Sequence, residues 1–382
     1  MEKIYTALGL MSGTSMDGID ASIISSIDGV QYDEKFNEYY EYDKGLYQKL
    51  CNLRDKIFSS KDLKKLSKEV KSLEKEITLF HAKVVNDVNH SIKKSTIPRP
   101  EIIGFHGQTI FHNPEEKISV QLGDGKLLSQ LTKKTVVYDF RQNDLKHGGQ
   151  GAPLAPIFHQ SIKNNINRRV ELPIIFINIG GISNATCFYN LKEKENKMFA
   201  GDIGPGNCLI DEWIRKNSKE KYDKDGLIAR AGKINRLILN KALDNFQFSN
   251  KGSLDIKNFD ISFVKGLSIE DGASTLTELT VKLIREGLND LLRKNKQEWG
   301  IDQEIIICGG GRKNKYLIEL LTLSFDCKNV SKIDEYNIDG DFIESQAFAF
   351  LAIRSLLNLP ISFPETTGCK KSCTGGVIVK NF

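Results

Sequence analysis

The chain has 382 residues, of which 40% are hydrophobic and 27% charged, and its net charge is +5. This length exceeds that of one ordinary core, so we expect a folded protein of two domains rather than a disordered chain. Its basic and acidic residues are interleaved, which argues against a nucleic-acid-binding arm, and no apolar stretch reaches the roughly 18 residues that a membrane helix needs.

The amino-terminal part of the chain predicts a β-hairpin followed by helix. Residues 3–10 and 19–27 have the composition of buried strands, and the segment between them contains Gly, Ser and Thr. A third strand is expected near 37–42, and a helical pattern covers 44–96. Apolar residues recur there at spacings of four and three, which predicts one core-facing helix surface formed by Leu66, Val70, Leu73, Ile77 and Phe80.

The middle of the chain alternates short apolar strands with helical segments and Gly-rich turns, the pattern of an α/β protein. A second hairpin is expected over 173–190, because two apolar segments flank Gly180-Gly181. Strands are predicted at 102–105, 118–122, 136–140, 174–179 and 304–311. Helices are predicted at 207–217, 228–246, 270–295, 314–323 and 343–358.

Three glycine-bearing turns each follow a predicted strand, at 12–18, 180–186 and 309–314. Glycine lets a backbone approach a phosphate closely, and exposed N–H groups and hydroxyls can bind phosphate oxygens. Any one turn alone is more often structural, but three together favour a nucleotide site. Neither the Walker pattern G-x-x-x-x-G-K-[ST] nor the dinucleotide pattern G-x-G-x-x-G occurs in the context that it requires, so another fold is expected.

Other chemical interpretations are weaker. The string SGTSM resembles the serine turn of a subtilisin-like hydrolase, but Asp17-Gly18 would break the helix that should follow. His106 and His112 do not have the spacing of a helical metal pair, and a hydrogen-bonding role for His106 is favoured. The seven cysteines lack paired ligand spacing, which indicates reduced thiols rather than a zinc site.

Seven strings carry a resemblance to a known family over essentially the whole chain. The chain closely resembles anhydro-N-acetylmuramic acid kinases, within the superfamily of actin, hexokinase and the heat-shock chaperone ATPases. The strings are LGLMSGTSMDGID (8–20), GFHGQTIFHNP (104–114), DFRQNDLKHGGQGAPLAP (139–156), NIGGISNAT (178–186), GDIGPGN (201–207), CGGGRKN (308–314) and ESQAFAFLA (344–352).

The resemblance implies a two-domain actin-like (RNase H-like) α/β ATPase fold with an active-site cleft between the domains. We expect residues 1–139 and 345–382 to form domain I and residues 140–344 to form domain II. The implied activity is ATP-dependent opening of the 1,6-anhydro ring of 1,6-anhydro-N-acetylmuramic acid with phosphorylation of O6. The products would be N-acetylmuramic acid 6-phosphate and ADP, in cell-wall (peptidoglycan) recycling.

The same resemblance implies residue roles. Asp17 and Asp20 would lie near Mg²⁺, directly or through water, in agreement with the preference of this ion for carboxylate oxygens. ATP would be held by Gly13, Thr14, Ser15, Met16, Asp17, Gly18, Ile19, Asp20, Gly180, Gly181, Asn184, Gly309, Gly310 and Gly311. Where the family usually has Ala-His after the third glycine turn, this chain has Arg312-Lys313.

Asp202 matches the family's catalytic base. It precedes a Gly-Pro-Gly turn, where a carboxylate without the family context would more often be a turn or capping residue. As a base it would take a proton from the water that attacks the anomeric carbon, in the manner of an inverting glycosidase. Substrate contacts are expected from Gln108, Thr109, Arg141, Asp144 and Glu344.

Two alternatives stay open: another hexokinase-like sugar kinase, and a non-catalytic actin-like nucleotide switch, because a fold does not fix a function. We expect a cytoplasmic protein without a signal peptide, a small amino sugar as its partner, and no nucleic-acid or membrane partner. A homodimer is an expectation from the resemblance alone.

Overall fold

The computed structural model describes residues 3–166, 173–191, 195–246, 259–300, 302–325 and 329–382. These residues form two compact units, the first from residues 1–165 and 342–382 and the second from 166–341. Sequence had placed the first boundary after residue 139. The observed boundary is later because the helices α5 (Gln142–Lys146) and α6 (Pro156–Asn165) belong to the first unit.

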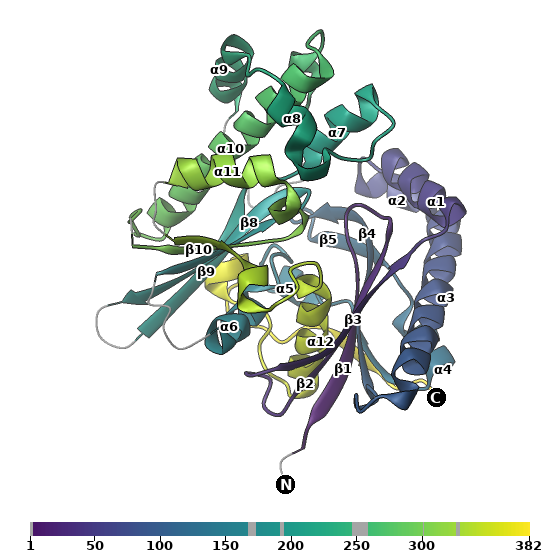
Figure 1. Ribbon diagram of the computed structural model, residues 1–382. Coiled ribbons are helices and arrows are strands. Elements are labelled where there is room, and N and C mark those ends of the chain that lie inside the picture. Colours follow the sequence, from purple (N-terminus) through teal and green to yellow (C-terminus); the bar gives the residue numbers. More distant parts are fainter. Residues whose placement is uncertain (1–2, 167–172, 192–194, 247–258, 301, 326–328) are drawn as a thin grey trace. The chain divides into compact units, whose positions relative to one another are not determined.

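The first unit contains a mixed sheet in the order β12-β6-β4-β1-β2-β3, with β5 paired to β4 (Figure 1). Its strands are β1 (Tyr5–Ser12), β2 (Gly18–Ser26), β3 (Asp33–Glu41), β4 (Ile102–Asn113), β5 (Ile118–Leu122), β6 (Thr135–Tyr138) and β12 (Val377–Val379). Its other helices are α1 (Lys44–Lys56), α2 (Ser60–Lys65), α3 (Ser67–Ser91), η1 (Ile92–Lys94), α4 (Gly125–Thr132), α12 (Ile343–Leu356) and α13 (Pro364–Thr367).

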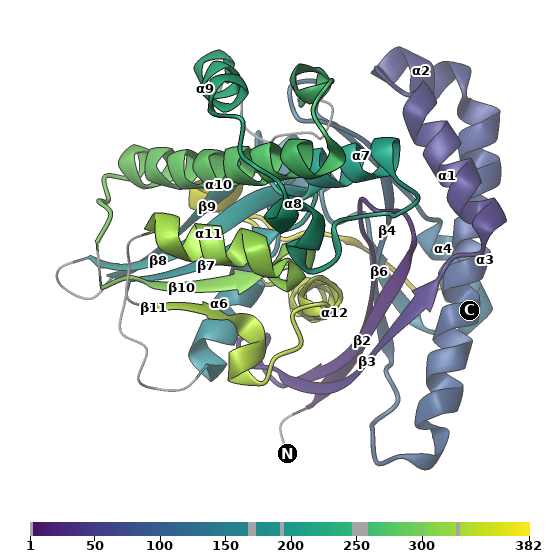
Figure 2. The same cartoon turned by 45° about the horizontal axis from the view of Figure 1, so that its top comes forward.

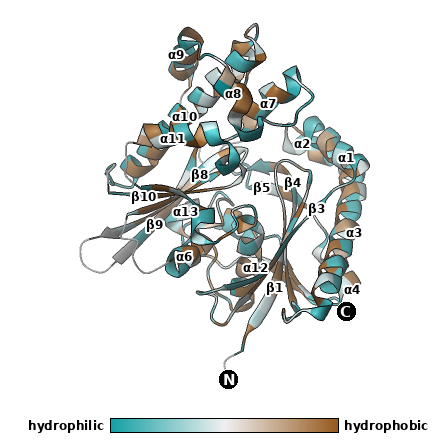
Figure 3. Ribbon diagram, viewed as in Figure 1, coloured by the Kyte–Doolittle hydropathy of each residue, from teal (hydrophilic) through white to brown (hydrophobic). Residues whose placement is uncertain are grey.

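Helix α12 packs against β1, β2 and β4, and α3 and α1 also contact the sheet. The contact with α12 is backbone to backbone, because a Cβ atom at Gly9 would come within 1.8 Å of the Ser345 carbonyl oxygen. Figure 3 shows hydrophobic and hydrophilic residues interspersed along α3. Leu73 and Ile77 are buried in the core there, as the helical spacing predicted.

The second unit has a sheet in the order β11-β10-β7-β8-β9. Its strands are β7 (Ile174–Ile179), β8 (Ile182–Leu191), β9 (Glu195–Pro205), β10 (Glu304–Cys308) and β11 (Asn329–Lys332). Its helices are α7 (Cys208–Asn217), η2 (Lys224–Gly226), α8 (Leu227–Ala231), α9 (Arg236–Asn245), η4 (Ser262–Val264), α10 (Ile269–Lys294), η5 (Gly310–Lys313), α11 (Lys315–Phe325) and η6 (Ile333–Tyr336). Helices α10 and α11 lie side by side over this sheet (Figure 2).

The two sheets share one pairing scheme. In the first unit β1–β2 and β2–β3 are antiparallel, while β1–β4 and β4–β6 are parallel. In the second unit β7–β8 and β8–β9 are antiparallel, while β7–β10 and β10–β11 are parallel. This duplicated arrangement confirms the predicted actin-like (RNase H-like) α/β fold; the expected cleft between the domains stays a prediction. Among the described helices, none is long and apolar enough to cross a membrane.

Candidate active site

The first glycine turn connects β1 to β2, as predicted. Thr14 and Ser15 are exposed at its tip, and the Ser15 hydroxyl donates a hydrogen bond to the Asp17 carboxylate. Met16 has a φ of 60° and is only 2% exposed, and Ile19 is fully buried. Two of the predicted ATP contacts are therefore buried in this structure.

A buried polar network holds this turn. Ser12 Oγ lies 2.6 Å from Gln108 Oε1, 2.8 Å from the Tyr42 hydroxyl and 2.9 Å from the Gly18 carbonyl oxygen. Gln108 Nε2 donates to the Gly13 carbonyl at 2.9 Å. Because Gln108 is completely buried, its amide braces the turn from β4, and this geometry favours a positioning role over the direct sugar contact predicted from sequence.

Acidic groups gather where β2 leaves the turn. Asp20 is paired with Tyr39 across β2 and β3. The pKa of Tyr39 is raised by burial, by the charges of Asp17, Glu41 and Asp20, and by a hydrogen bond with Asp17. The region is therefore negative and rich in oxygen ligands, which suits a hard cation such as Mg²⁺. No preformed cluster of three or more metal-binding side chains occurs among the described residues.

Arg141 is held by two described neighbours. Its Nη2 donates to His106 Nε2 at 3.0 Å, and its Nη1 donates to the Gly151 carbonyl oxygen at 3.3 Å. Burial and the positive charge of Arg141 hold the pKa of His106 well below its ordinary value. His106 is therefore neutral; its Nδ1 donates to the Gly107 carbonyl oxygen at 2.8 Å, which leaves Nε2 as the acceptor for Arg141.

Asp144 is almost fully buried and has protein partners on both carboxylate oxygens. The Gly151 N–H and the Thr367 hydroxyl each donate to it at 2.6 Å. Asp144 thereby shapes the 148–151 loop, and this arrangement gives it a positioning role instead of the predicted substrate contact. Thr367 lies far away in the sequence and was not predicted. Glu344 lies in the first turn of α12, as the sequence indicated.

In the second unit the Gly180-Gly181 turn joins β7 to β8 and is bonded to the start of α7. The Gly206 N–H donates to the Gly181 carbonyl at 2.9 Å, and the Asn207 N–H donates to the Gly180 carbonyl at 2.8 Å. A Cβ atom at Gly206 would come within 2.1 Å of the Gly180 carbonyl oxygen, so the two segments are in backbone contact.

A polar row crosses the second sheet from this turn. Asp202 lies in β9 opposite Asn184 of β8, Asn184 lies opposite Asn178 of β7, and Asn178 is in register with Cys308 of β10. Directly paired residues present their side chains on one face, about 4.5–5.5 Å apart. The sheet therefore brings the predicted base and Asn184 together. Asn178 was not predicted, although a polar residue within the apolar string IIFINI was a usable signal.

The third glycine turn follows β10, as predicted. Gly309 has a φ of 76°, and a Cβ atom there would lie 2.3 Å from Asn178 Oδ1, so the polar row reaches this turn. A Cβ atom at Gly311 would lie 2.3 Å from Ile179 Cγ2. Packing therefore requires both glycines. Arg312, where the chain departs from the family pattern, is buried.

One glycine in each turn is not required by packing. A Cβ atom at Gly13 would meet nothing closer than 3.9 Å, one at Gly180 nothing closer than 3.5 Å, and one at Gly310 nothing within 4 Å. None of the three has the positive φ that favours glycine. The fold itself would accept alanine at these positions, so the bare backbone is available for close approach by a ligand.

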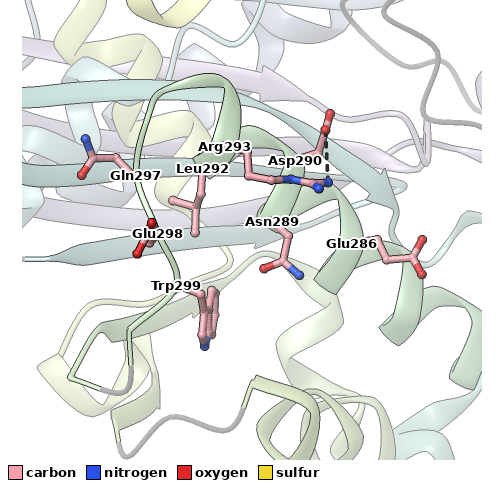
Figure 4. A pocket seen from close by; sticks show the side chains of 8 residues that line it. All are labelled: Glu286, Asn289, Asp290, Leu292, Arg293, Gln297, Glu298 and Trp299. Carbon is pink, nitrogen blue, oxygen red and sulfur yellow. Dashed lines mark ion pairs between the residues drawn. The ribbon is translucent and has the colours of Figure 1, made fainter.

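The hollow shown in Figure 4 lies elsewhere. It has a volume of about 630 Å³ and is lined near the carboxyl end of α10 by side chains that include Glu286, Asp290 and Trp299. None of the site residues predicted from sequence lines it. In the first unit the predicted residues lie in and beside the β1–β2 turn, near the 148–151 loop (Arg141 and Asp144) and at the start of α12 (Glu344), and in the second unit they lie along the polar row and its glycine turns.

A profile of the family described as "Anhydro-N-acetylmuramic acid kinase" matches residues 5–381. The chain is 53% identical over 387 residues to the anhydro-N-acetylmuramic acid kinase of Pelagibacter ubique and 37% identical over 386 residues to that of Brucella canis, with 100% of both chains covered in each case. A ROK family glucokinase from Streptomyces griseus is a distant structural likeness, with a TM-score of 0.38, 11% identity and coverage of 92% of this chain and 100% of that one.

The matched range extends over nearly the whole chain, so it covers all three glycine turns and Asp202. This chain therefore belongs to the anhydro-N-acetylmuramic acid kinase family.

Proposed function

We propose that this chain carries out the kinase reaction of its family with Asp202 as the general base. The observation that carries the proposal is the polar row in which Asp202, Asn184 and Asn178 lead to Gly309. Asp202 takes a proton from a water that attacks the anomeric carbon of 1,6-anhydro-N-acetylmuramic acid. The bond between that carbon and O6 breaks, and O6 forms the new bond to the γ-phosphorus of ATP as ADP leaves.

ATP binding is supported by three glycines that packing does not require, one in each glycine-bearing turn. These glycines are Gly13, Gly180 and Gly310. Phosphoryl transfer demands positioning and charge neutralisation more than covalent work by the protein, and backbone N–H groups of such turns supply both. Thr14 at the exposed tip of the first turn adds a hydroxyl donor, and the Ser15 hydroxyl donates to the Asp17 carboxylate.

Asp17 and Asp20 would hold Mg²⁺ in this proposal. Their carboxylates fit the oxygen preference of the ion, and Mg²⁺ usually needs only one or two carboxylates besides water and phosphate. When bound, the ion neutralises charge on the triphosphate. The chain contributes by bracing this turn: Gln108, which accepts from Ser12, holds the Gly13 carbonyl, and the Tyr42 N–H donates to the Asp17 carbonyl oxygen at 2.8 Å.

For the sugar, we assign direct contacts to Thr109, Arg141 and Glu344. The contacts of Arg141 with His106 and Gly151 orient a guanidinium that can pair with the lactyl carboxylate of a muramic acid. We further expect a cytoplasmic protein that acts on this small amino sugar, without a nucleic-acid partner; homodimerisation stays an expectation from the family.

The test is ADP release by the purified chain with 1,6-anhydro-N-acetylmuramic acid, glucose and N-acetylglucosamine. Sugar-dependent ADP release with the anhydro-sugar alone is expected. Release with the ordinary hexoses would favour a general hexokinase-like enzyme, and slow release independent of sugar would favour a nucleotide switch.

Asp202→Asn keeps the size of the side chain and removes the base. We expect sugar-dependent ADP release to fall by about 10²–10⁴-fold while ATP binding by calorimetry is retained. Asp290→Asn, a carboxylate on α10 that forms an ion pair with Lys294 at 2.9 Å, is the matched control and should stay near wild-type activity. Full activity of Asp202→Asn would remove this residue from the mechanism.

A further inference from the structure

Arg312 is a buried cation with every donor of its guanidinium engaged. Its side chain is 4% exposed. Nε and Nη2 donate to the two carboxylate oxygens of Asp334 at 2.7 and 3.0 Å, and Nη2 also reaches Asp339 Oδ1 at 3.4 Å. Nη1 donates to Asp341 Oδ1 at 2.7 Å and to the Gly309 carbonyl oxygen at 3.1 Å. These five contacts match the five N–H donors of arginine.

The contact with Gly309 sets the orientation of a peptide plane. The same carbonyl oxygen also accepts from the Arg312 backbone N–H at 3.2 Å. In a trans peptide the C=O of Gly309 and the N–H of Gly310 point in opposite directions. Because the Gly309 carbonyl is held toward Arg312, the Gly310 N–H points away from Arg312. Gly310 is also the glycine of this turn that packing does not require.

The three carboxylates anchor Arg312 to a different part of the second unit. Asp334 lies in η6, and Asp339 and Asp341 lie in the segment that ends this unit. Gly340 packs over the guanidinium, because a Cβ atom there would come within 2.4 Å of Arg312 Nε. The turn after β10 and the segment 334–341 are thus fastened to each other through one side chain.

The charges of the cluster argue against phosphate as the ligand of Arg312. Burial opposes its charged form, but bonds to Asp334 and Asp341 outweigh burial and raise its pKa, so it stays charged. Three carboxylates against Arg312 and Lys313 give a net charge of −1. With its donors engaged and its surroundings negative, Arg312 is not placed to bind a phosphate directly.

We propose that Arg312 is a positioning residue for nucleotide binding, which holds the Gly309–Gly310 peptide so that the Gly310 N–H points away from the carboxylate cluster and is available to ATP. The inference rests on the proposed use of this turn for ATP. Its function is therefore to set affinity for the nucleotide without contacting it, and affinity for the sugar should not depend on it.

The test compares Arg312→Lys with Lys313→Ala in direct ATP titrations without sugar. Lysine keeps the charge but has only three donors on one nitrogen, so it cannot bind Asp334 in two-point fashion and also hold Gly309. We expect its dissociation constant for ATP to rise about tenfold, and the KM for the sugar to stay within about twofold. Lys313 is 62% exposed and pairs with Asp341 alone, so Lys313→Ala removes a neighbouring charge and should leave both values unchanged.

Gly340→Ala is a second variant for the case that Arg312→Lys does not fold. Its added methyl group displaces the Arg312 guanidinium without changing any charge. We expect Gly340→Ala to weaken ATP binding and to leave the KM for the sugar unchanged. The proposal is overturned if folded variants bind ATP like the wild type, or if affinity for ATP and for the sugar fall together. Because ATP binding is measured without turnover, an inactive wild-type chain would count against the proposed function, while the comparison of dissociation constants for ATP would still test the role of Arg312.

Discussion

At the scale of single residues, Gly310 and Gly311 are neighbours in one turn, but packing requires glycine only at Gly311. A methyl group at Gly311 would collide with Ile179, whereas one at Gly310 meets open space. We expect Gly310→Ala to keep the wild-type thermal midpoint and to weaken ATP binding at least several-fold, because the added methyl group blocks close approach of the ligand. Differential scanning fluorimetry with and without ATP measures both effects.

Gly311→Ala is the matched comparison. Overpacking of this kind costs roughly 1–3 kcal/mol, so its thermal midpoint should fall by a few degrees without ligand. If Gly310→Ala instead lost stability and kept its response to ATP, the assignment of bare backbone to ligand binding would be wrong.

The sequence predictions at this scale came from local patterns and from the strings that resemble the family. The positions of the turns were predicted in this way and are confirmed, while the role of Asp202 stays a prediction from the family strings. Asn178 and Thr367 were not, because their importance depends on partners brought by strand register and by the return of the chain to the first unit. Gln108 and Asp144 were predicted as sugar contacts, but their burial and full hydrogen bonding could be known only from the structure.

At the scale of elements, Gln108 connects strand β4 to the turn between β1 and β2. We expect Gln108→Met, which keeps the volume and loses the hydrogen bonds, to destabilise the first unit by about 1–3 kcal/mol because Ser12 and Gly13 lose buried partners. The loosened turn should also bind ATP more weakly. Urea unfolding and ATP titration measure the two consequences.

The control for that variant is Gln303→Met in the second unit. Gln303 is equally buried and donates to the Tyr189 hydroxyl at 2.6 Å, so the loss of stability should be similar. Its ATP affinity should not change. Equal weakening of ATP binding in both variants would show that general destabilisation, and not the brace, explains the result for Gln108.

Hydrophobic periodicity predicted most of the helices and strands, and the errors in the predicted helices have physical reasons. The helix expected over 44–96 is interrupted at residues 57–59, where Ser59 and Asp62 form a capping box that was legible in the sequence. The helix expected over 228–246 is divided near Gly232, where a Cβ atom would come within 2.0 Å of the Glu270 carbonyl oxygen. That close approach of α10 is a tertiary contact, and no local pattern reports it.

At the scale of the whole molecule, the two units repeat one strand scheme but differ in their buried ionisable groups. The six histidines of the chain all precede residue 166, in the first unit. Burial lowers the pKa of His81 and His159 to about 4, and burial with the charge of Arg141 holds the pKa of His106 well below its ordinary value. In the second unit, burial raises the pKa of Asp211 to about 7.

These shifts have opposite consequences when the pH falls from 7 to 5. The buried histidines stay neutral in the folded first unit but are protonated in the unfolded chain below about pH 6.5, so each removes up to about 2 kcal/mol of stability by pH 5. Burial also raises the pKa values of Glu74 and Asp139 in this unit, which offsets a part of the loss. Asp211 takes up its proton in the folded second unit as the pH falls below about 7, and that unit is stabilised.

We therefore expect acid to unfold the first unit before the second. Hydrogen exchange followed by mass spectrometry at pH 7, 6 and 5, corrected for the intrinsic pH dependence of exchange, separates peptides of residues 3–165 from those of 173–325. Protection of β1 and β4 should fall, and protection of β7 and β10 should hold. His159→Gln removes one buried titrating group, so the unfolded chain binds one proton fewer. In this variant the loss of protection in the first unit should occur at lower pH. A parallel loss of protection in both units, or no effect of His159→Gln, would show that the buried histidines do not determine how the first unit responds to acid.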